Sequence, residues 1–218
     1  MRKLILKMSM SLDGFVGGSR SEVDWIFASM DQGATDWTMR SVWNAGVHIM
    51  GSHTFHDMAS YWPSSTEVFA APMNEIPKVV FSKDPTVTRR AGSQTTRAVT
   101  DANSARTAPL STDALAENEK SWRNARVMSG DLATDIAQLK SEPGKDIMAH
   151  GGASFARSLV RLGLVDEYQL LVHPTARGTG LPLFSELPRP IALRLVGATA
   201  FDAGAVAHVY VPAPAKAS

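Results

Sequence analysis

The chain has 218 residues and a formal net charge of +1, from 22 Lys and Arg against 21 Asp and Glu. This balance provides no electrostatic basis for binding nucleic acid or an acidic membrane surface. The sequence contains no cysteine, which excludes disulfides, thiolate metal sites and a cysteine nucleophile. Its length favours a single domain over residues 1–218. No stretch reaches the roughly 20 apolar residues of a membrane span, and we therefore expect a soluble, cytoplasmic protein.

Predicted strands and helices alternate along the first part of the chain. Residues 4–10 predict a strand, in which Lys7 interrupts the apolar side chains, and a glycine-marked loop follows. Trp37, Arg40 and Trp43 are spaced by three, which predicts a helix over 36–43. Short apolar runs predict strands at 47–50 and 78–82, with a helix at 54–61 between them.

Residues 84–124 depart from this alternation. The segment is rich in Thr, Arg, Ala and Ser up to about residue 108, and Pro85 and Pro109 punctuate it. One or two helical turns are expected at 115–122. We therefore predict that 84–124 is a surface insertion in the domain.

The alternation resumes after this segment. Three more strands are predicted at 125–129, 146–150 and 167–173, separated by helices at 132–139 and 155–162. Residues 191–201 and 205–211 predict an antiparallel hairpin around Asp202, Ala203 and Gly204. This order predicts an α/β fold with a mostly parallel central sheet, helices on both faces and a C-terminal antiparallel hairpin.

Two of the predicted strand-to-helix junctions, at 49–55 and 147–155, carry glycines. In parallel sheets ligands bind beyond the carboxyl ends of the strands, where the first free N–H groups of a helix can hold a phosphate. The alternative is that each glycine only fits a tight turn. The sequence contains neither G-x-G-x-x-G nor a P-loop, and it lacks the G-x-S-x-G pattern of hydrolases.

Four segments carry a resemblance to a known family. Met50–Phe55 resembles the Met-Gly-Arg-x-Thr-Trp/Tyr segment of the dihydrofolate reductase superfold, and Ile147–Phe155 resembles its diglycine turn. Ser9–Gly14 and Pro182–Phe184 are similar to the RibD C-terminal domain family within that superfold. The resemblance covers nearly the whole chain except 84–124, and it implies a dihydrofolate-reductase-like fold.

The same resemblance implies an NADPH-dependent reductase that passes a hydride to a flat heterocycle, such as a pterin or an aminopyrimidine. Two alternatives stay open: a 5-amino-6-(5-phosphoribosylamino)uracil reductase of riboflavin biosynthesis, and a nucleotide-binding protein without turnover. Relatives often pair, so a homodimer is expected, and the apolar terminal strands offer an edge for it.

The resemblance also implies the cofactor contacts. The phosphates would meet Gly51, Ser52, His53 and Thr54 in the first turn and Gly151, Gly152, Ala153 and Ser154 in the second. The adenosine 2′-phosphate would lie near Ser82 and Lys83, and the nicotinamide near Met8, Ser9, Val16 and Gly17. Ser52 stands where the family has Arg, which leaves NADH open beside NADPH. The cations that would replace that Arg are Lys83, Arg89 or Arg90.

A proton donor is also needed, because reduction of a C=N bond places hydride on carbon and a proton on nitrogen. A buried carboxylate suits this role, and the resemblance places one near the start of the first helix, where Asp36 lies. The alternative is that Asp36 caps the helix. Asp13 is interpreted as a turn former, and Asp24 is a further candidate.

The histidines and tryptophans have mainly structural interpretations. His53 and His56 have a metal-like spacing, but the resemblance assigns His53 to a phosphate, so no metal site is predicted. His150 is expected to pack or to line the site, and His48 and His173 to be structural. Core packing is expected for the tryptophans, with an aromatic substrate site as the alternative; those concerned are Trp25, Trp37 and Trp43.

Overall fold

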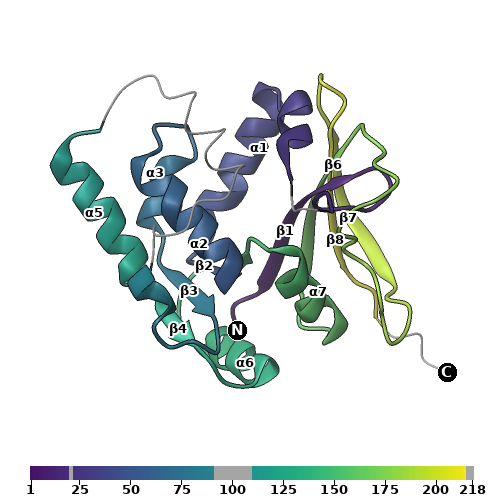
Figure 1. The fold of residues 1–218 in the computed structure, drawn as a ribbon. Helices are drawn as coiled ribbons and strands as arrows, with labels where there is room; N and C mark the ends of the chain where they lie inside the picture. The colour runs from purple at the N-terminus through teal and green to yellow at the C-terminus, as the bar shows by residue number, and fades with distance from the viewer. Residues whose placement is uncertain (20–21, 91–109, 215–218) are drawn as a thin grey trace.

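The structure is a computed structural model that describes residues 1–19, 22–90 and 110–214. Eight strands form one sheet in the order β4-β3-β2-β5-β1-β6-β8-β7 (Figure 1). The strands are β1 (Leu4–Ser11), β2 (Val47–Gly51), β3 (Lys78–Phe81), β4 (Arg126–Met128), β5 (Ile147–Ala149), β6 (Glu167–His173), β7 (Leu193–Ala200) and β8 (Val206–Pro212). Strands β1 to β6 are parallel, and β8 pairs antiparallel with β6 and β7. The predicted mostly parallel sheet with a C-terminal antiparallel pair is confirmed.

Helices cover both faces of the sheet (Figure 1). The helices are α1 (Gln32–Trp43), α2 (Ser52–Tyr61), α3 (Ala70–Glu75), α5 (Thr112–Arg123), α6 (Leu132–Ser141) and α7 (Ala153–Arg161). Three short 3-10 segments accompany them: η1 (Asp24–Ser29), η2 (Trp62–Ser64) and η3 (Val87–Arg90).

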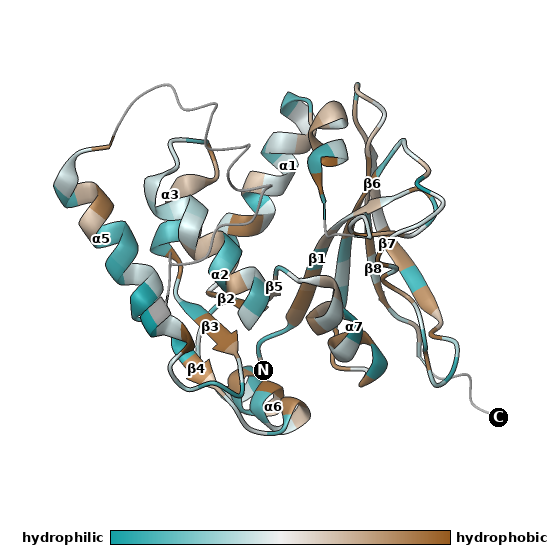
Figure 2. Ribbon diagram, viewed as in Figure 1, coloured by the Kyte–Doolittle hydropathy of each residue, from teal (hydrophilic) through white to brown (hydrophobic). Residues whose placement is uncertain are grey.

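Successive side chains of a strand point to opposite faces, and β1 divides the core in this way. Leu4 and Leu6 pack with residues of α6 and α7, whereas Ile5 packs with residues of α1, α2 and α5. Both faces are therefore buried, which explains the short, nearly continuous apolar runs of the parallel strands. Figure 2 shows hydrophobic residues concentrated in strands such as β1 and β3, while α5 is mostly hydrophilic.

Helix α1 begins four residues earlier than predicted. The carboxylate of Asp31 accepts a hydrogen bond from the backbone N–H of Ala34 at 2.8 Å and caps the helix. The first turn contains Gln32 and Gly33, which show no apolar periodicity, so the pattern became visible only near Trp37. Helix α3 was not predicted either, because it is short and contains Pro72.

The prediction of a surface insertion over 84–124 is wrong for the parts that the structure describes. Val87 and Trp122 are both buried in the core, and α5 connects the neighbouring parallel strands β3 and β4. The inward side of α5 contains Leu115, Asn118 and Trp122 at helical spacing. Because Asn118 is polar, this side of α5 shows no continuous apolar periodicity in the sequence. Residues 91–109 lie outside the described ranges.

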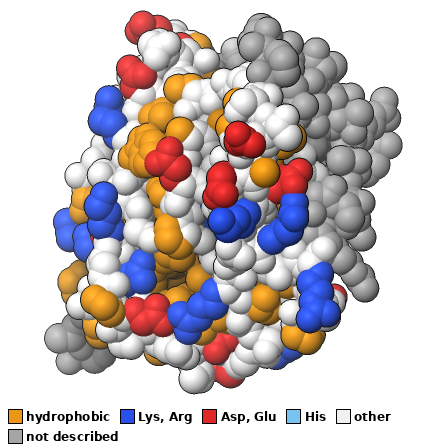
Figure 3. Space-filling view, turned by 90° about the vertical axis from the view of Figure 1, so that its left-hand side faces the viewer, with side chains coloured by type: hydrophobic (Ala, Val, Ile, Leu, Met, Phe, Trp, Pro, Cys, Tyr) orange, Lys and Arg blue, Asp and Glu red, His pale blue; other side chains and the backbone are white. Residues whose placement is uncertain are grey.

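The described surface shows no concentration of one charge on the face that carries α5. Figure 3 shows acidic and basic side chains interspersed over that face, as the balanced composition predicts. None of the helices in the described ranges is both long and apolar enough to cross a membrane.

Candidate functional site

The structure brings the two glycine turns together. Strands β2 and β5 are neighbours, so α2 and α7 begin side by side at the carboxyl edge of the sheet. The backbone N–H of Gly152 donates a hydrogen bond to Thr54 Oγ1 at 2.5 Å. A Cβ on Gly51 would lie 3.2 Å from the Cβ of Phe155, so a larger residue would push the turns apart. The peptide bond between Gly151 and Gly152 is cis.

Both of these helices start without a side-chain cap. Helices α1, α5 and α6 are capped by Asp31, Ser111 and Asp131. Among the described residues, no side chain caps α2 or α7, whose N-cap positions are Gly51 and Gly152. The first N–H groups of α2 and α7 are therefore free for an anion, and the helix dipoles favour a negative charge there.

The remaining residues predicted for these turns lie in the first turns of the two helices. Ser52 and His53 open α2, and Ala153 and Ser154 open α7. The His53 side chain is 76% exposed, and its Nε2 lies 3.7 Å from Asp57 Oδ2. It is therefore free to meet a ligand at the surface.

The residues predicted to lie near the nicotinamide occupy the same edge. Strand β1 is the neighbour of β5, and a Cβ on Gly151 would lie 3.0 Å from Met8 Sδ. Val16 N–H donates to the Leu181 carbonyl, and Leu181 N–H donates to the Gly17 carbonyl, both at 2.8 Å. The loop after β1 is thereby tied to the loop between β6 and β7. Ser9 follows Met8 on β1, with its side chain directed to the opposite face.

Ser82 and Lys83 follow β3 at this edge, two strands from β5. Lys83 Nζ donates hydrogen bonds to the carbonyls of Ser129 and Gly130, at 2.7 and 3.0 Å. Ser82 Oγ accepts a hydrogen bond from the backbone N–H of Asp84. The ammonium of Lys83 is exposed and has one further N–H for a phosphate.

The structure contradicts both interpretations of Asp36. Its side chain is exposed and accepts a hydrogen bond from Gln32 Nε2 at 2.8 Å, so it is not a buried carboxylate. The helix cap is Asp31 instead. The buried residues of α1, a helix that is fully described, are Ala34, Thr38, Ser41 and Val42, and none is acidic.

Asp24 is likewise exposed. Asp13 accepts hydrogen bonds from Ser11 Oγ and from the backbone N–H groups of Arg177 and Gly178. These hydrogen bonds lower the pKa of Asp13 to about 2. Its interpretation as a turn residue is confirmed, and it also holds the loop after β6 against the end of β1.

Lys7 is the candidate functional residue that sequence analysis missed. It points from β1 to the face covered by α1, where its Nζ lies 5.8 Å from the centroid of the Trp37 ring. Burial lowers the pKa of Lys7 to about 8. Among the described residues, no carboxylate lies within ion-pair distance of Nζ. The signal in the sequence was a single cation within an otherwise apolar strand.

Three histidines form with Lys7 what we call the lysine–histidine cluster: Lys7, His48, His150 and His173. The charge of Lys7 acts on His150 and His173, and His48 contacts His150. The rings of His48 and His150 meet edge to face, with centroids 4.4 Å apart. His173 Nδ1 lies 2.8 Å from Ser29 Oγ.

The histidines of this cluster are neutral at pH 7. Burial, and then the positive charge of Lys7, lowers the pKa of His173 to about 4. Burial, followed by repulsion from His48 and Lys7, lowers the pKa of His150 well below its ordinary value.

Within the described residues, His150 Nε2 and His173 Nε2 are buried without a hydrogen-bond partner. Buried polar atoms of this kind require a partner, which a ligand would supply. Lys7 and His150 are only partly buried, so a small molecule can reach them.

Trp25 and Trp37 lie beside this cluster, whereas Trp43 is 39% exposed. The Trp25 ring contacts that of His173 edge to face, with centroids 5.4 Å apart. Trp25 and Trp37 therefore flank the cluster, and Trp37 also packs against a buried group of small and aliphatic residues, as expected for core packing.

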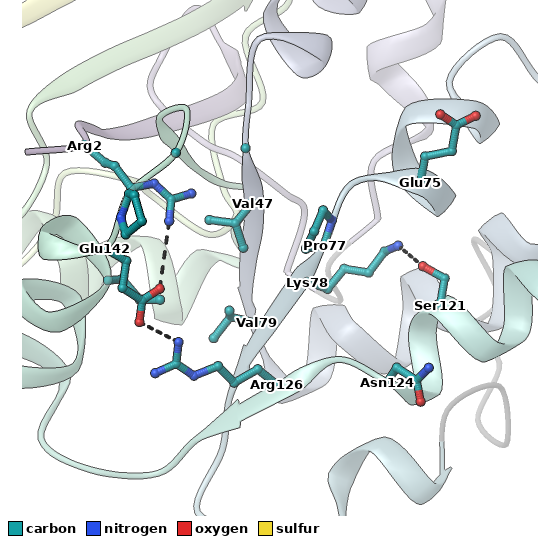
Figure 4. Close-up of a pocket in the computed structure, with 14 residues that line it drawn as sticks. Arg2, Val47, Glu75, Pro77, Lys78, Val79, Ser121, Asn124, Arg126 and Glu142 are labelled. Carbon is teal, nitrogen blue, oxygen red and sulfur yellow. Dashed lines mark hydrogen bonds and ion pairs between the residues drawn. The ribbon is translucent and has the colours of Figure 1, made fainter.

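A cavity of about 440 Å³ lies at the opposite edge of the sheet, where β2, β3 and β4 begin (Figure 4). Its cations are already engaged. Arg2 and Arg126 both face Glu142, and Lys78 Nζ donates to Ser121 Oγ at 2.7 Å and to the Asn74 carbonyl at 2.6 Å. We interpret this cavity as structural. No group of three or more His, Cys, Asp or Glu side chains in the described ranges could hold a metal ion.

Comparisons with known proteins agree with this geometry. Residues 2–207 match the RibD C-terminal domain family. The chain is 30% identical over 209 residues to the uncharacterized protein YyaP of Bacillus subtilis (strain 168), which covers 96% of this chain and 94% of that protein.

Solved structures with the same fold include a pyrimidine reductase-like protein from Corynebacterium diphtheriae. It has a TM-score of 0.60 and 14% identity, and the match covers 98% of this chain and 93% of that chain. A diaminohydroxyphosphoribosylaminopyrimidine deaminase/5-amino-6-(5-phosphoribosylamino)uracil reductase from Thermotoga maritima has a TM-score of 0.60 and 12% identity, over 97% of this chain and 57% of that chain. These likenesses show the fold, and the predicted dihydrofolate-reductase-like architecture is confirmed.

Proposed function

Since the chain belongs to the RibD C-terminal domain family, we propose that it is a reductase that uses a nicotinamide nucleotide to reduce a flat nitrogen heterocycle. The observation that carries this proposal is the pair of uncapped helices that begin side by side at Gly51 and Gly152. They provide two sets of free N–H groups for the phosphates of a dinucleotide. The lysine–histidine cluster lies next to them, across β5 and β1.

The residues present fit a dinucleotide. A Cβ on Gly51 would lie against Phe155, and a Cβ on Gly151 would lie against Met8. Because both residues are glycine, the space that such a Cβ would fill beside the backbone stays open. Residues 51–54 and 151–154 would hold the phosphates, and Met8, Ser9, Val16 and Gly17 would contact the nicotinamide. When bound, the cofactor would supply a hydride to the carbon of a C=N bond, which is a ring bond in a dihydropterin and, in the phosphoribosylaminouracil, the imine that forms when the ribose ring opens.

Ser82 and Lys83 would hold the 2′-phosphate and select NADPH over NADH. The third N–H of Lys83 supports this assignment, since Ser52 provides no cation in the first turn.

Titration of Lys83→Met with both cofactors tests the assignment of the 2′-phosphate to Lys83. Lys120→Met is the control, because Lys120 lies on the outer side of α5. We expect NADPH binding to weaken about tenfold in Lys83→Met and NADH binding to stay unchanged. Equal binding of the two cofactors to the natural protein would refute the preference.

Lys7 replaces Asp36 as the proposed proton donor. With a pKa of about 8, its ammonium is mostly protonated at pH 7 and gives up a proton more easily than an ordinary lysine. The neutral histidines of the cluster leave Lys7 as its only source of a positive charge. Lys7 would therefore place the proton on the substrate nitrogen, and His150 Nε2 and His173 Nε2 would orient the ring by hydrogen bonds.

The lysine–histidine cluster favours an aminouracil reductase, one of the two alternatives that the sequence left open, over a pterin reductase. It presents the hydrogen-bond donor Lys7 and neutral imidazoles, and α1 buries no acidic residue over it. A pterin has an amino group and an adjacent ring N–H, and a carboxylate is the acceptor that suits this pair. A uracil presents carbonyl oxygens, which accept hydrogen bonds from an ammonium.

The test is oxidation of NADPH with 5-amino-6-(5-phosphoribosylamino)uracil and, separately, with 7,8-dihydropterin. We expect turnover of the uracil and little of the pterin. Turnover of the pterin alone would reverse the substrate assignment. NADPH binding without oxidation in either case would support the remaining alternative, a nucleotide-binding protein without turnover.

We also propose that two copies pair along β7. This strand forms the edge of the sheet, and its adjacent residues Leu195 and Val196 are 49% and 47% exposed. Antiparallel pairing of β7 with β7 of a second copy would be self-complementary and would satisfy the free backbone groups of both edges.

A further inference from the structure

Arg177 has an unusual position between two loops at the carboxyl edge of the sheet. It lies in the loop between β6 and β7, and its guanidinium carbon is 5.5 Å from the centroid of the Trp25 ring. The side chain is only 21% exposed. Its Nε is buried and has no hydrogen-bond partner among the described residues.

One acidic group of the described residues lies within ion-pair range of this guanidinium, and it satisfies the guanidinium only in part. Glu22 Oε1 lies 3.9 Å from Arg177 Nη2, which is within ion-pair range but beyond a hydrogen bond. The Glu22 side chain is 39% exposed. A guanidinium has five N–H donors, arranged to bind a carboxylate or phosphate through two of them at once. Arg177 therefore has unused capacity for an anion.

A chain of ring contacts connects Arg177 to the proposed reaction site. Trp25 contacts Arg177 on one side and the His173 ring on the other, with 5.4 Å between the ring centroids. Burial, and then the positive charge of Lys7, lowers the pKa of His173, so Lys7 and His173 interact. Arg177 thus lies one aromatic ring outward from the lysine–histidine cluster, where an extended substituent of a bound heterocycle would emerge.

We propose that Arg177 is a specificity-determining residue that binds an anionic tail, a phosphate or a carboxylate, carried by the heterocyclic substrate. The proposal rests on the proposed function for the position of the ring. Trp25 provides the flat surface along which the linker would lie, and Glu22 is the counter-ion that the tail displaces. A substrate without a negative charge on its tail would leave Arg177 unsatisfied and would bind less tightly.

Calorimetric titration without any cofactor tests this inference. The probes are ribose 5-phosphate, 4-aminobenzoyl-glutamate, ribose and inorganic phosphate, and the first two distinguish a phosphate tail from a carboxylate tail. We expect one of these two to bind, ribose not to bind, and inorganic phosphate to bind more weakly. In Arg177→Met the affinity should fall about 10- to 100-fold.

Three further variants separate binding from a purely structural role of Arg177. Arg189→Met removes a cation from the same loop at an exposed position and should leave the affinity unchanged. Arg177→Lys keeps the charge without the paired donors and should bind with intermediate affinity. Glu22→Gln removes the counter-ion and should tighten binding.

Several outcomes would overturn the proposal: no binding of either tailed probe to the natural protein, equal binding to Arg177→Met, or equal affinity for inorganic phosphate. Weaker binding in Glu22→Gln would do so as well. Because NADPH takes no part in the titration, a protein that binds the tail but oxidises no NADPH would refute the proposed function and leave the anion subsite standing.

Discussion

Replacement of Lys7 by methionine should stabilise the protein and inactivate it. Burial lowers the pKa of Lys7 from 10.5 to about 8. Each unit of pKa corresponds to about 1.4 kcal/mol, so the folded state disfavours the charged form by about 3 kcal/mol. Methionine fills a similar volume without a charge. We therefore expect Lys7→Met to raise the free energy of unfolding at pH 7 by up to about 3 kcal/mol.

The sign of the pH dependence follows from the direction of the shift. The folded protein has the lower pKa, so between pH 8 and 10.5 the unfolded chain binds more protons at Lys7 than the folded protein does. The natural protein should gain stability as the pH rises through this window, and Lys7→Met should lack this gain. Below pH 8 both states are protonated and the penalty is constant.

The assay combines urea unfolding from pH 7 to 10.5 with NADPH oxidation by the aminouracil substrate. A general acid contributes about 10²- to 10⁴-fold to the rate, so turnover should fall by that factor in Lys7→Met. The matched control is Lys3→Met, one residue before β1, because the Lys3 side chain is 57% exposed. A variant of Lys7 that is less stable than the natural protein and still fully active would refute the assignment.

Three other predictions concern the fold and its edges. Thr54→Val removes the acceptor for the Gly152 N–H, which should lower the free energy of unfolding by about 1–3 kcal/mol and weaken NADPH binding, as measured by urea unfolding and by titration. Asp36→Asn should keep full activity because the carboxylate is exposed; a loss of more than about tenfold would restore it as a catalytic candidate. Val196→Glu should convert a dimer into a monomer of 23.5 kDa in light scattering, and a natural protein that is already monomeric would reject pairing along β7.

The order of strands and helices could be predicted because it depends on local patterns. The apolar runs of β1, β2 and β6 and the helical spacing in α6 and α7 are visible within windows of a few residues. The start of α1 was missed because its first turn holds Gln32 and Gly33, and α5 was missed as a core helix because a single large apolar residue, Trp122, anchors it. In these two segments tertiary packing outweighs the local pattern.

The candidate site was predictable only in part. The glycine turns at 51 and 151–152 were found because glycines at the junction of a strand and a helix are visible within short segments of the sequence. The exposure of Asp36 was not predictable, because it depends on where α1 begins. Lys7 carried a weak signal, and Arg177 none, since its partners Glu22 and Trp25 are distant in the chain.

The sequence by itself determined the α/β class, the two glycine turns and the family, since each depends on short segments whose backbone preferences act locally. Only the tertiary structure decided that Lys7 lies near the neutral His150 and His173 and that Arg177 lies over the Trp25 ring. These contacts depend on which strands are neighbours and on how α1 and η1 cover them. Burial then sets the charge state of each group, because desolvation penalises an ion wherever the fold removes water from it.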